Sequence, residues 1–140
     1  MTQINPYISF HGKCREAMTF YKECLGGELM FQTVGDTPMG AQCSEDEKEQ
    51  IMHASLTKDG ILLMATDMIA PGQEFIKGTD IALSLSCSSE EEINDFFSKL
   101  SAGGEIVDPL KTQFWGALFG VLSDKFGIKW MLNYDKNQSA

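Results

Sequence analysis

The spacing of hydrophobic and polar residues changes along the chain and predicts alternating strands and helices. In residues 4–10, INPYISF, apolar and polar side chains alternate, which is typical of a strand with one buried face. In residues 13–25 the apolar side chains instead recur every three or four positions, at Ala17, Phe20, Tyr21, Cys24 and Leu25. This stripe predicts a helix, and the Gly26-Gly27 pair that follows it is typical of a helix end.

Three strands are predicted after this helix. Residues 28–34 form the first, and residues 35–50 follow as a turn-rich and then acidic loop. Residues 51–57 and 61–67 form the other two, and Lys58-Asp59-Gly60 between them favours a tight hairpin. A second loop is expected at residues 68–79.

The same order of elements then starts again. Residues 81–87 predict a strand, and Ser89 with Glu92 three positions later fits the capping box of a new helix. That helix carries its own apolar stripe and ends at Gly103-Gly104, so FFSKLSAGGE near its end echoes FYKECLGGE in the first helix. Strands beginning at Glu105 and covering residues 115–124 and 127–134 complete the series.

The repetition predicts an α+β fold of two tandem βαβββ modules, at about residues 4–67 and 79–135. A helix can cover only one face of a four-stranded sheet, and a second module supplies a partner for the other face. The 140 residues are expected to form a single domain in which two curled mixed sheets surround a cup.

Composition excludes several classes of function. The formal net charge of −9 argues against nucleic-acid binding, which needs a basic surface. No apolar run is long enough for a membrane helix and no secretory signal is visible, so a cytoplasmic protein is expected. The four cysteines, Cys14, Cys24, Cys43 and Cys87, form no CxxC pair, which favours reduced structural thiols over a metal ligand or a reactive thiol.

Several stretches resemble one known family. INPYISFHGKCREAMTFYKECLGGE, MHASL and FWGALFGVLSDKFGIKWMLNY are similar to the PhnB-like branch of the vicinal oxygen chelate superfamily. That superfamily includes glyoxalase I, bleomycin and fosfomycin resistance proteins and extradiol dioxygenases, and the branch is often labelled demethylubiquinone methyltransferase-like. The resemblance covers roughly residues 4–135 and implies the glyoxalase fold and a homodimer. The chain has no glycine-rich strand-to-helix turn in a parallel sheet, so the methyltransferase label has no support in its residues.

The resemblance also implies where a divalent metal would bind. Metal-using members ligate the ion from their first, fourth, fifth and eighth strands. Carried over to this chain, those positions fall on Pro6 or Asn5, Met64, Asp80 and Met131. Only Asp80 suits a hard cation, and one carboxylate does not make a metal site. A glyoxalase-type centre is therefore not expected, and Asp80 is the candidate metal ligand among these four positions.

Other residues are candidates for ligand binding or catalysis. His53 alternates with Ser55 and Thr57 on the polar face of its strand, where it would serve as a general base, a hydrogen-bond donor or a half-buried structural residue. His11 follows the first strand and is expected at the surface. Apolar and aromatic residues of the cup suggest a small-molecule pocket, although each would also suit a core or a dimer seam: Met64, Phe114, Trp115, Phe119, Trp130 and Met131. Asp80 is expected to line the same pocket.

Three hypotheses about function follow. The first is a small-molecule-binding protein without a glyoxalase-type metal site. The second is an enzyme of the lyase, isomerase or dioxygenase kind, either metal-dependent through Asp80 and His53 or metal-free with His53 as the base. The third is a drug-sequestering resistance protein whose acidic cleft attracts a cationic ligand.

Overall fold

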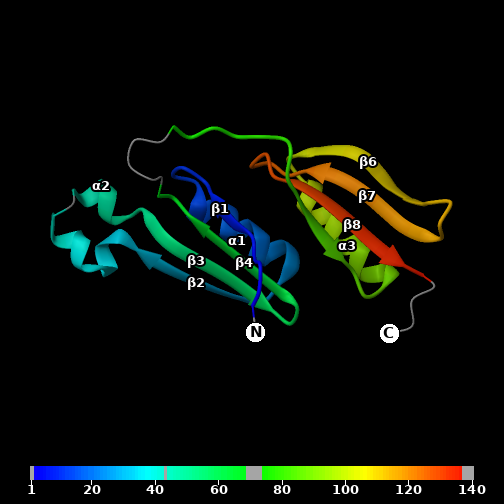
Figure 1. The fold of residues 1–140 in the computed structure, drawn as a ribbon, viewed down its shortest axis with the longest axis horizontal. Coiled ribbons are helices and arrows are strands. Elements are labelled where there is room, and N and C mark those ends of the chain that lie inside the picture. The colour runs from blue at the N-terminus through cyan, green and yellow to red at the C-terminus, as the bar shows by residue number, and fades with distance from the viewer. Residues whose placement is uncertain (1, 43, 69–73, 137–140) are drawn as a thin grey trace. The chain divides into compact units, whose positions relative to one another are not determined.

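The chain folds into two compact units, each with one four-stranded sheet (Figure 1). The computed structural model describes residues 2–42, 44–68 and 74–136. Unit 1 extends to Ile76 and unit 2 begins at Lys77. Each unit has the element order strand, helix, three strands, so the predicted α+β fold of repeated βαβββ modules is confirmed.

Unit 1 contains β1 (Tyr7–Ser9), α1 (Cys14–Leu25), β2 (Glu28–Thr33), β3 (Ile51–Lys58) and β4 (Ile61–Thr66). Its sheet has the order β1-β4-β3-β2, in which β1 runs parallel to β4 and the other pairs are antiparallel. The first strand is shorter than predicted, because only three of the seven expected residues have strand geometry.

Residues 34–48 contain short helices where the sequence predicted a loop. These are η1 (Val34–Asp36), η2 (Pro38–Gln42) and α2 (Glu45–Lys48). The α2 turn begins at Ser44, whose hydroxyl oxygen accepts a hydrogen bond from the Glu47 amide at 3.2 Å. A polar cap and the acidic residues that follow it stabilise one turn of helix even without an apolar stripe.

Unit 2 contains β5 (Ala82–Ser86), α3 (Glu90–Ser101), β6 (Glu105–Thr112), β7 (Ala117–Ser123) and β8 (Lys129–Asp135). Its sheet order, β5-β8-β7-β6, repeats the topology of unit 1, with a parallel β5–β8 pair. The α3 helix begins with the predicted cap, because the Ser89 hydroxyl accepts from the Glu92 amide at 3.1 Å. The Glu92 carboxylate in turn accepts from the Ser88 amide, one residue before the cap.

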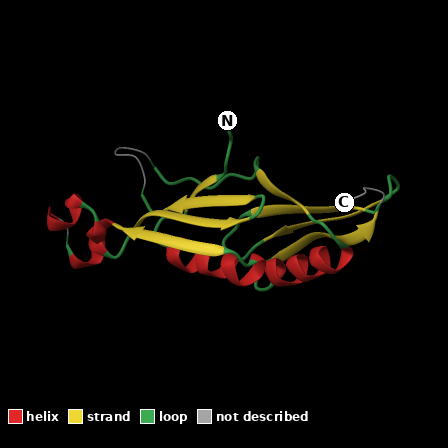
Figure 2. Cartoon of the chain, turned by 90° about the horizontal axis from the view of Figure 1, so that it is seen from below, coloured by secondary structure: helices red, strands yellow, loops and turns green. Residues whose placement is uncertain are grey.

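One helix covers one face of each sheet and forms the core of that unit (Figure 2). In unit 1, Leu56 and Leu63 lie in register on this face and are almost completely buried, as is Tyr21 of α1. In unit 2, Phe97 of α3 packs against Gly120 of β7, where an added Cβ would lie 2.8 Å from the ring. Among the residues that the structure describes, no helix of the same unit covers the opposite face of each sheet, and we call this face the open face.

The echoed Gly-Gly pairs mark the same close contact in both units. Gly27 follows α1 with φ +99°, and a Cβ there would collide with the Thr57 carbonyl oxygen of β3. Gly104 follows α3, and a Cβ there would collide with the Ser123 carbonyl oxygen of β7. Glycine is needed at both positions because the chain leaving the helix passes directly against the backbone of a strand.

Two buried aspartates tie backbone segments together. Asp67, directly after β4, accepts hydrogen bonds from the amides of Gly12 and Cys14 with one carboxylate oxygen and from Ile51 with the other, at 2.8–3.0 Å. It therefore joins the start of α1 to the start of β3.

Asp124 fulfils a similar role in unit 2. One of its carboxylate oxygens accepts from the amides of Phe126 and Ile128, at 2.8 and 3.1 Å. The other accepts from the indole nitrogen of Trp130 at 2.8 Å. This carboxylate fixes the β7–β8 turn and one core side chain together.

Candidate functional site

The open face of unit 1 carries a row of polar and apolar side chains outside the core. Tyr7, Met64, Ser55 and Met30 lie in register across all four strands. Register partners project to the same side of a sheet, so these side chains form one row. Tyr7 is 51% exposed and Met30 is 69% exposed, which leaves the row accessible within this unit.

His53 lies on the same face and forms a hydrogen bond with Tyr7. The Tyr7 hydroxyl is 2.9 Å from the His53 Nδ1, and the two rings are tilted with centroids 5.6 Å apart. Tyr7 belongs to β1 and His53 to β3, with β4 between those strands, so their side chains meet above β4. Burial, with a smaller electrostatic effect from Cys14, raises the pKa of Tyr7 above its ordinary value.

The open face of unit 2 is more apolar. Met131 lies in register with Val121 and with Ser84, and Phe119 lies in the row beside them. Trp115 is next to this face, with its ring centroid 6.1 Å from that of Phe119, and it is half exposed. Met131 and Trp115, which the sequence suggested as pocket residues, both lie outside the core of unit 2.

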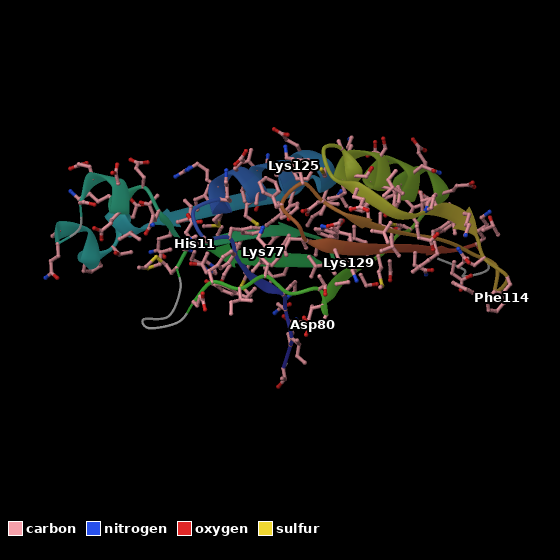
Figure 3. The ribbon with its side chains drawn as sticks, turned by 90° about the horizontal axis from the view of Figure 1, so that it is seen from above. His11, Lys77, Asp80, Phe114, Lys125 and Lys129 are labelled. Atoms are coloured by element: carbon pink, nitrogen blue, oxygen red, sulfur yellow. The ribbon has the colours of Figure 1, made fainter. Side chains whose placement is uncertain are left out.

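Phe114 lies at the tip of the β6–β7 hairpin (Figure 3). Its side chain is 97% exposed and meets Trp115 edge to face, with centroids 4.9 Å apart. The pair therefore presents aromatic surface that unit 2 itself does not cover.

Trp130, which the sequence suggested as a pocket residue, is placed in the core. It is 2% exposed and lies in register with Leu122 and Leu83 on the face that α3 covers. Neighbouring residues of a strand project to opposite sides, so Trp130 and Met131 cannot line one surface. Its indole N–H is satisfied by Asp124, as a buried indole requires.

Asp80 lies outside the sheet, in the exposed segment that leads into β5 (Figure 3). The segment is held by Lys77, which donates to the Phe126 carbonyl at 2.9 Å, and by Lys129, which donates to the Thr79 carbonyl at 3.4 Å. The residue of β5 in register with Met131 is Ser84, four positions further along. The fifth-strand position that the family resemblance assigned to Asp80 is therefore corrected to Ser84.

The same correction applies to the first strand. The register partner of Met64 is Tyr7, and neither Pro6 nor Asn5 belongs to β1. The Pro6 carbonyl oxygen accepts a hydrogen bond from the Met64 amide at 3.2 Å.

These residues do not fit the divalent metal that the fold family implies. The positions corrected by register hold a neutral phenol, a hydroxyl and two thioethers, which are not the imidazole and carboxylate ligands of a hard or borderline ion. Among residues 2–42, 44–68 and 74–136, no group of three His, Cys, Asp or Glu side chains could hold a metal ion.

The described thiols are unsuited to nucleophilic chemistry. Burial, reinforced by the Asp67 carboxylate, raises the pKa of Cys14 to about 12. Burial and Glu92 raise the pKa of Cys87 to about 12. Both stay protonated at neutral pH, and the thiolate is the reactive form. Cys24 is buried, and Cys43 lies outside the described residues.

The two histidines have different surroundings. His11 is exposed, as predicted, and its ring stacks on Phe75 with centroids 4.9 Å apart and an angle of 14°. Its φ of +48° is in the left-handed region. His53 is the histidine that lies within a sheet and beside another polar side chain.

Sequence reasoning missed Tyr7 as a site residue. Tyr7 occupies one of the polar positions in the alternating pattern of residues 4–10. This position was the only sequence signal that its side chain lies on the open face. Its pairing with His53 depends on the position of β1 beside β4, which no local pattern encodes.

Comparisons with known proteins agree with this fold. A family model described as the Glyoxalase/Bleomycin resistance protein/Dioxygenase superfamily matches residues 3–132. Protein YjdN of Escherichia coli (strain K12) is 33% identical, over 96% of this chain and 97% of the relative.

Two solved structures are also similar. Protein PA1353 from Pseudomonas aeruginosa has a TM-score of 0.84 and 38% identity, covering 96% of this chain and 98% of that one. The PhnB protein from Bacillus cereus has a TM-score of 0.73 and 27% identity, covering 95% and 99%. In the described part of this chain, no helix has the length and apolarity needed to cross a membrane.

Proposed function

The chain belongs to the Glyoxalase/Bleomycin resistance protein/Dioxygenase superfamily and is related to YjdN and PhnB, and on this basis we propose that it binds a small organic molecule on its open sheet faces. The observation that carries the proposal is the accessible Tyr7–His53 pair beside Met64, on a face that no described helix of unit 1 covers. A few polar groups among apolar ones are typical of small-molecule sites.

The residues favour binding over a metal-dependent reaction. Thioethers at Met64 and Met131 adapt to flat or irregular apolar ligands but are poor ligands for hard cations. Half-exposed Trp115 adds an aromatic surface in unit 2. A metal-free reaction with His53 as the base is the alternative.

Two planar dyes of opposite charge test the proposal. We expect saturable binding of anionic 8-anilinonaphthalene-1-sulfonate or of cationic ethidium, measured by fluorescence titration. Met64→Gln and Met131→Gln each replace an apolar thioether on an open face by a polar amide of similar length, and each is expected to weaken binding of either dye at least tenfold. Glu23→Ala, on the exposed side of α1, is the matched control and should bind like the wild type. Equal dye affinity in all four proteins would refute the proposal.

The charge of the dye that binds more tightly distinguishes between the ligand classes. A preference for ethidium that disappears at high salt would support the drug-sequestering hypothesis, since the net charge is −9. A preference for the anionic dye would count against it.

Metal titration tests the enzyme alternative directly. We expect no stoichiometric binding of Ni²⁺, Zn²⁺ or Mn²⁺ by calorimetry to protein dialysed against a chelator. Stoichiometric binding that Asp80→Ala abolishes would restore the metal-dependent hypothesis, with Asp80 as a ligand.

We also propose that the protein acts as a homodimer. Support comes from the exposed aromatic pair Phe114 and Trp115 and from half-exposed Ile106 and Val107, all in unit 2. Light scattering should give twice the 15.5 kDa mass of the chain. A mass of one chain at micromolar concentration would contradict the dimer.

A further inference from the structure

The Tyr7–His53 hydrogen bond determines which ring nitrogen of His53 faces a ligand. The bond uses Nδ1 of the imidazole. No hydrogen bond to Nε2 is present among the described residues, so that nitrogen is available on the open face. The two ring nitrogens of a neutral histidine have opposite roles, and the partner of one fixes the role of the other.

The phenol is the better donor of the pair. The unprotonated nitrogen of a neutral imidazole is a far stronger base than a phenol oxygen. The reference pKa of the imidazolium lies near neutral pH, so this nitrogen holds a proton under conditions in which a phenol oxygen does not. Pairing the O–H with the Nδ1 lone pair therefore joins the stronger donor to the stronger acceptor. The reverse arrangement would leave the phenol hydrogen and the imidazole lone pair both unpaired. The raised pKa of Tyr7 agrees with a phenol that keeps its hydrogen.

We propose that Tyr7 donates to Nδ1 and holds His53 in the tautomer with hydrogen on Nε2, so that the open face of unit 1 recognises a hydrogen-bond acceptor on its ligand, such as a carbonyl oxygen. The ligand class rests on the proposed small-molecule function. When the ring is protonated, Nδ1 also carries hydrogen and Tyr7 accepts instead. Nε2 is a donor in both states.

This assignment changes the role expected for His53. A ring with hydrogen on Nε2 cannot remove a proton from a ligand through that nitrogen, so His53 binds and orients instead of acting as a general base there. Tyr7 is a positioning residue, because it acts through His53. Ser55 and Met64 in the neighbouring row supply a hydroxyl and an apolar surface beside the donor.

Long-range ¹H–¹⁵N correlation spectra of the ligand-free protein test the tautomer. At pH 8 we expect His53 to show a protonated Nε2 and an unprotonated Nδ1. In Tyr7→Phe, which keeps the ring but removes the donor, the Nδ1 signal should move toward that of a mixed tautomer. The chain has only two histidines, so His11→Gln assigns both. His11 has no contact with Tyr7 among the described residues and should be unchanged in Tyr7→Phe.

Two results would overturn the assignment. One is a wild-type His53 with hydrogen on Nδ1 and a bare Nε2. The other is a His53 signature that is identical in the wild type and Tyr7→Phe. Neither depends on any ligand.

Two small probes test the ligand class. Acetophenone offers a carbonyl acceptor, and benzylammonium offers only donors on a similar ring. We expect acetophenone to shift the His53 Nε2 signal in the wild type and to shift it at most half as much in Tyr7→Phe. A larger Nε2 shift with benzylammonium would refute the acceptor class. If His53 shows the expected tautomer but neither probe and neither dye binds saturably, the proposed function is refuted and the role of Tyr7 still holds.

Discussion

Replacing Asp67 should destabilise unit 1 more than any change at an exposed carboxylate. Asp67 is 8% exposed and accepts from three backbone amides, two of which, those of Cys14 and Ile51, are in buried hydrogen bonds. Asp67→Ala leaves those donors without an acceptor, and each buried unsatisfied donor costs about 1–3 kcal/mol. The third amide, that of Gly12, is partly buried and can bind water. We therefore expect a loss of about 3 kcal/mol in the free energy of unfolding.

Urea titration followed by far-ultraviolet circular dichroism measures this loss. Both tryptophans, Trp115 and Trp130, belong to unit 2, so tryptophan fluorescence does not follow unit 1 directly. With a urea slope of about 1–3 kcal/mol per molar, a 3 kcal/mol loss lowers the midpoint by about 1–3 M. Asp67→Asn keeps one acceptor oxygen but turns an amide N–H₂ toward the remaining donors, so its midpoint should lie between those of the wild type and Asp67→Ala.

Glu23→Ala is the control for this experiment. Glu23 is exposed on α1, and a surface substitution of this kind changes stability by about 0.5 kcal/mol or less. If Asp67→Ala lowered the midpoint no more than Glu23→Ala does, the claim that Asp67 joins α1 to β3 would be refuted.

Three further predictions concern packing, thiols and capping. Gly120→Ala should lower the free energy of unfolding in urea by about 1–3 kcal/mol, because its Cβ would overlap the ring of Phe97 on α3. The control Gly60→Ala meets nothing within 4 Å and should unfold like the wild type, so equal midpoints for the two variants would contradict this packing. Cys14 and Cys87 should resist iodoacetamide at pH 8 and react in urea, as read by peptide mapping, because their pKa of about 12 keeps them protonated; alkylation of the native protein at the rate of a free thiol would show otherwise. Ser89→Ala removes the cap of α3 and should cost about 1 kcal/mol, measured by thermal unfolding, and an unchanged midpoint would count against the cap.

The fold was predictable because its signals are local and repeated. The stripes that include Phe20 and Phe97 define helix faces by spacing alone, and both residues are buried as the spacing requires. The Gly-Gly pairs mark the helix ends without any knowledge of the sheet. The α2 helix was missed because Ser44 and its acidic neighbours give a cap but no apolar stripe.

The site was less predictable because it depends on register. Trp130 and Met131 are equally apolar, and only the pairing of β8 with its neighbours shows which of them projects toward α3. The metal-ligand positions taken from the family resemblance were wrong for the same reason. In the first strand, the β1–β4 pair places Tyr7, and not Pro6, beside Met64. Parallel pairing between distant strands leaves no signature in either strand alone.

The parallel pairs that close each sheet also bear on how the chain folds during synthesis. All strand pairs of unit 1 form between residues up to Thr66, and those of unit 2 need Asp135. At about 5–20 residues per second, the ribosome releases the last strand of unit 1 about 3–14 seconds before that of unit 2. Unit 1 can therefore complete its sheet around the nascent β1 while unit 2 is still being translated, which lowers the chance that strands of the two repeats pair with each other.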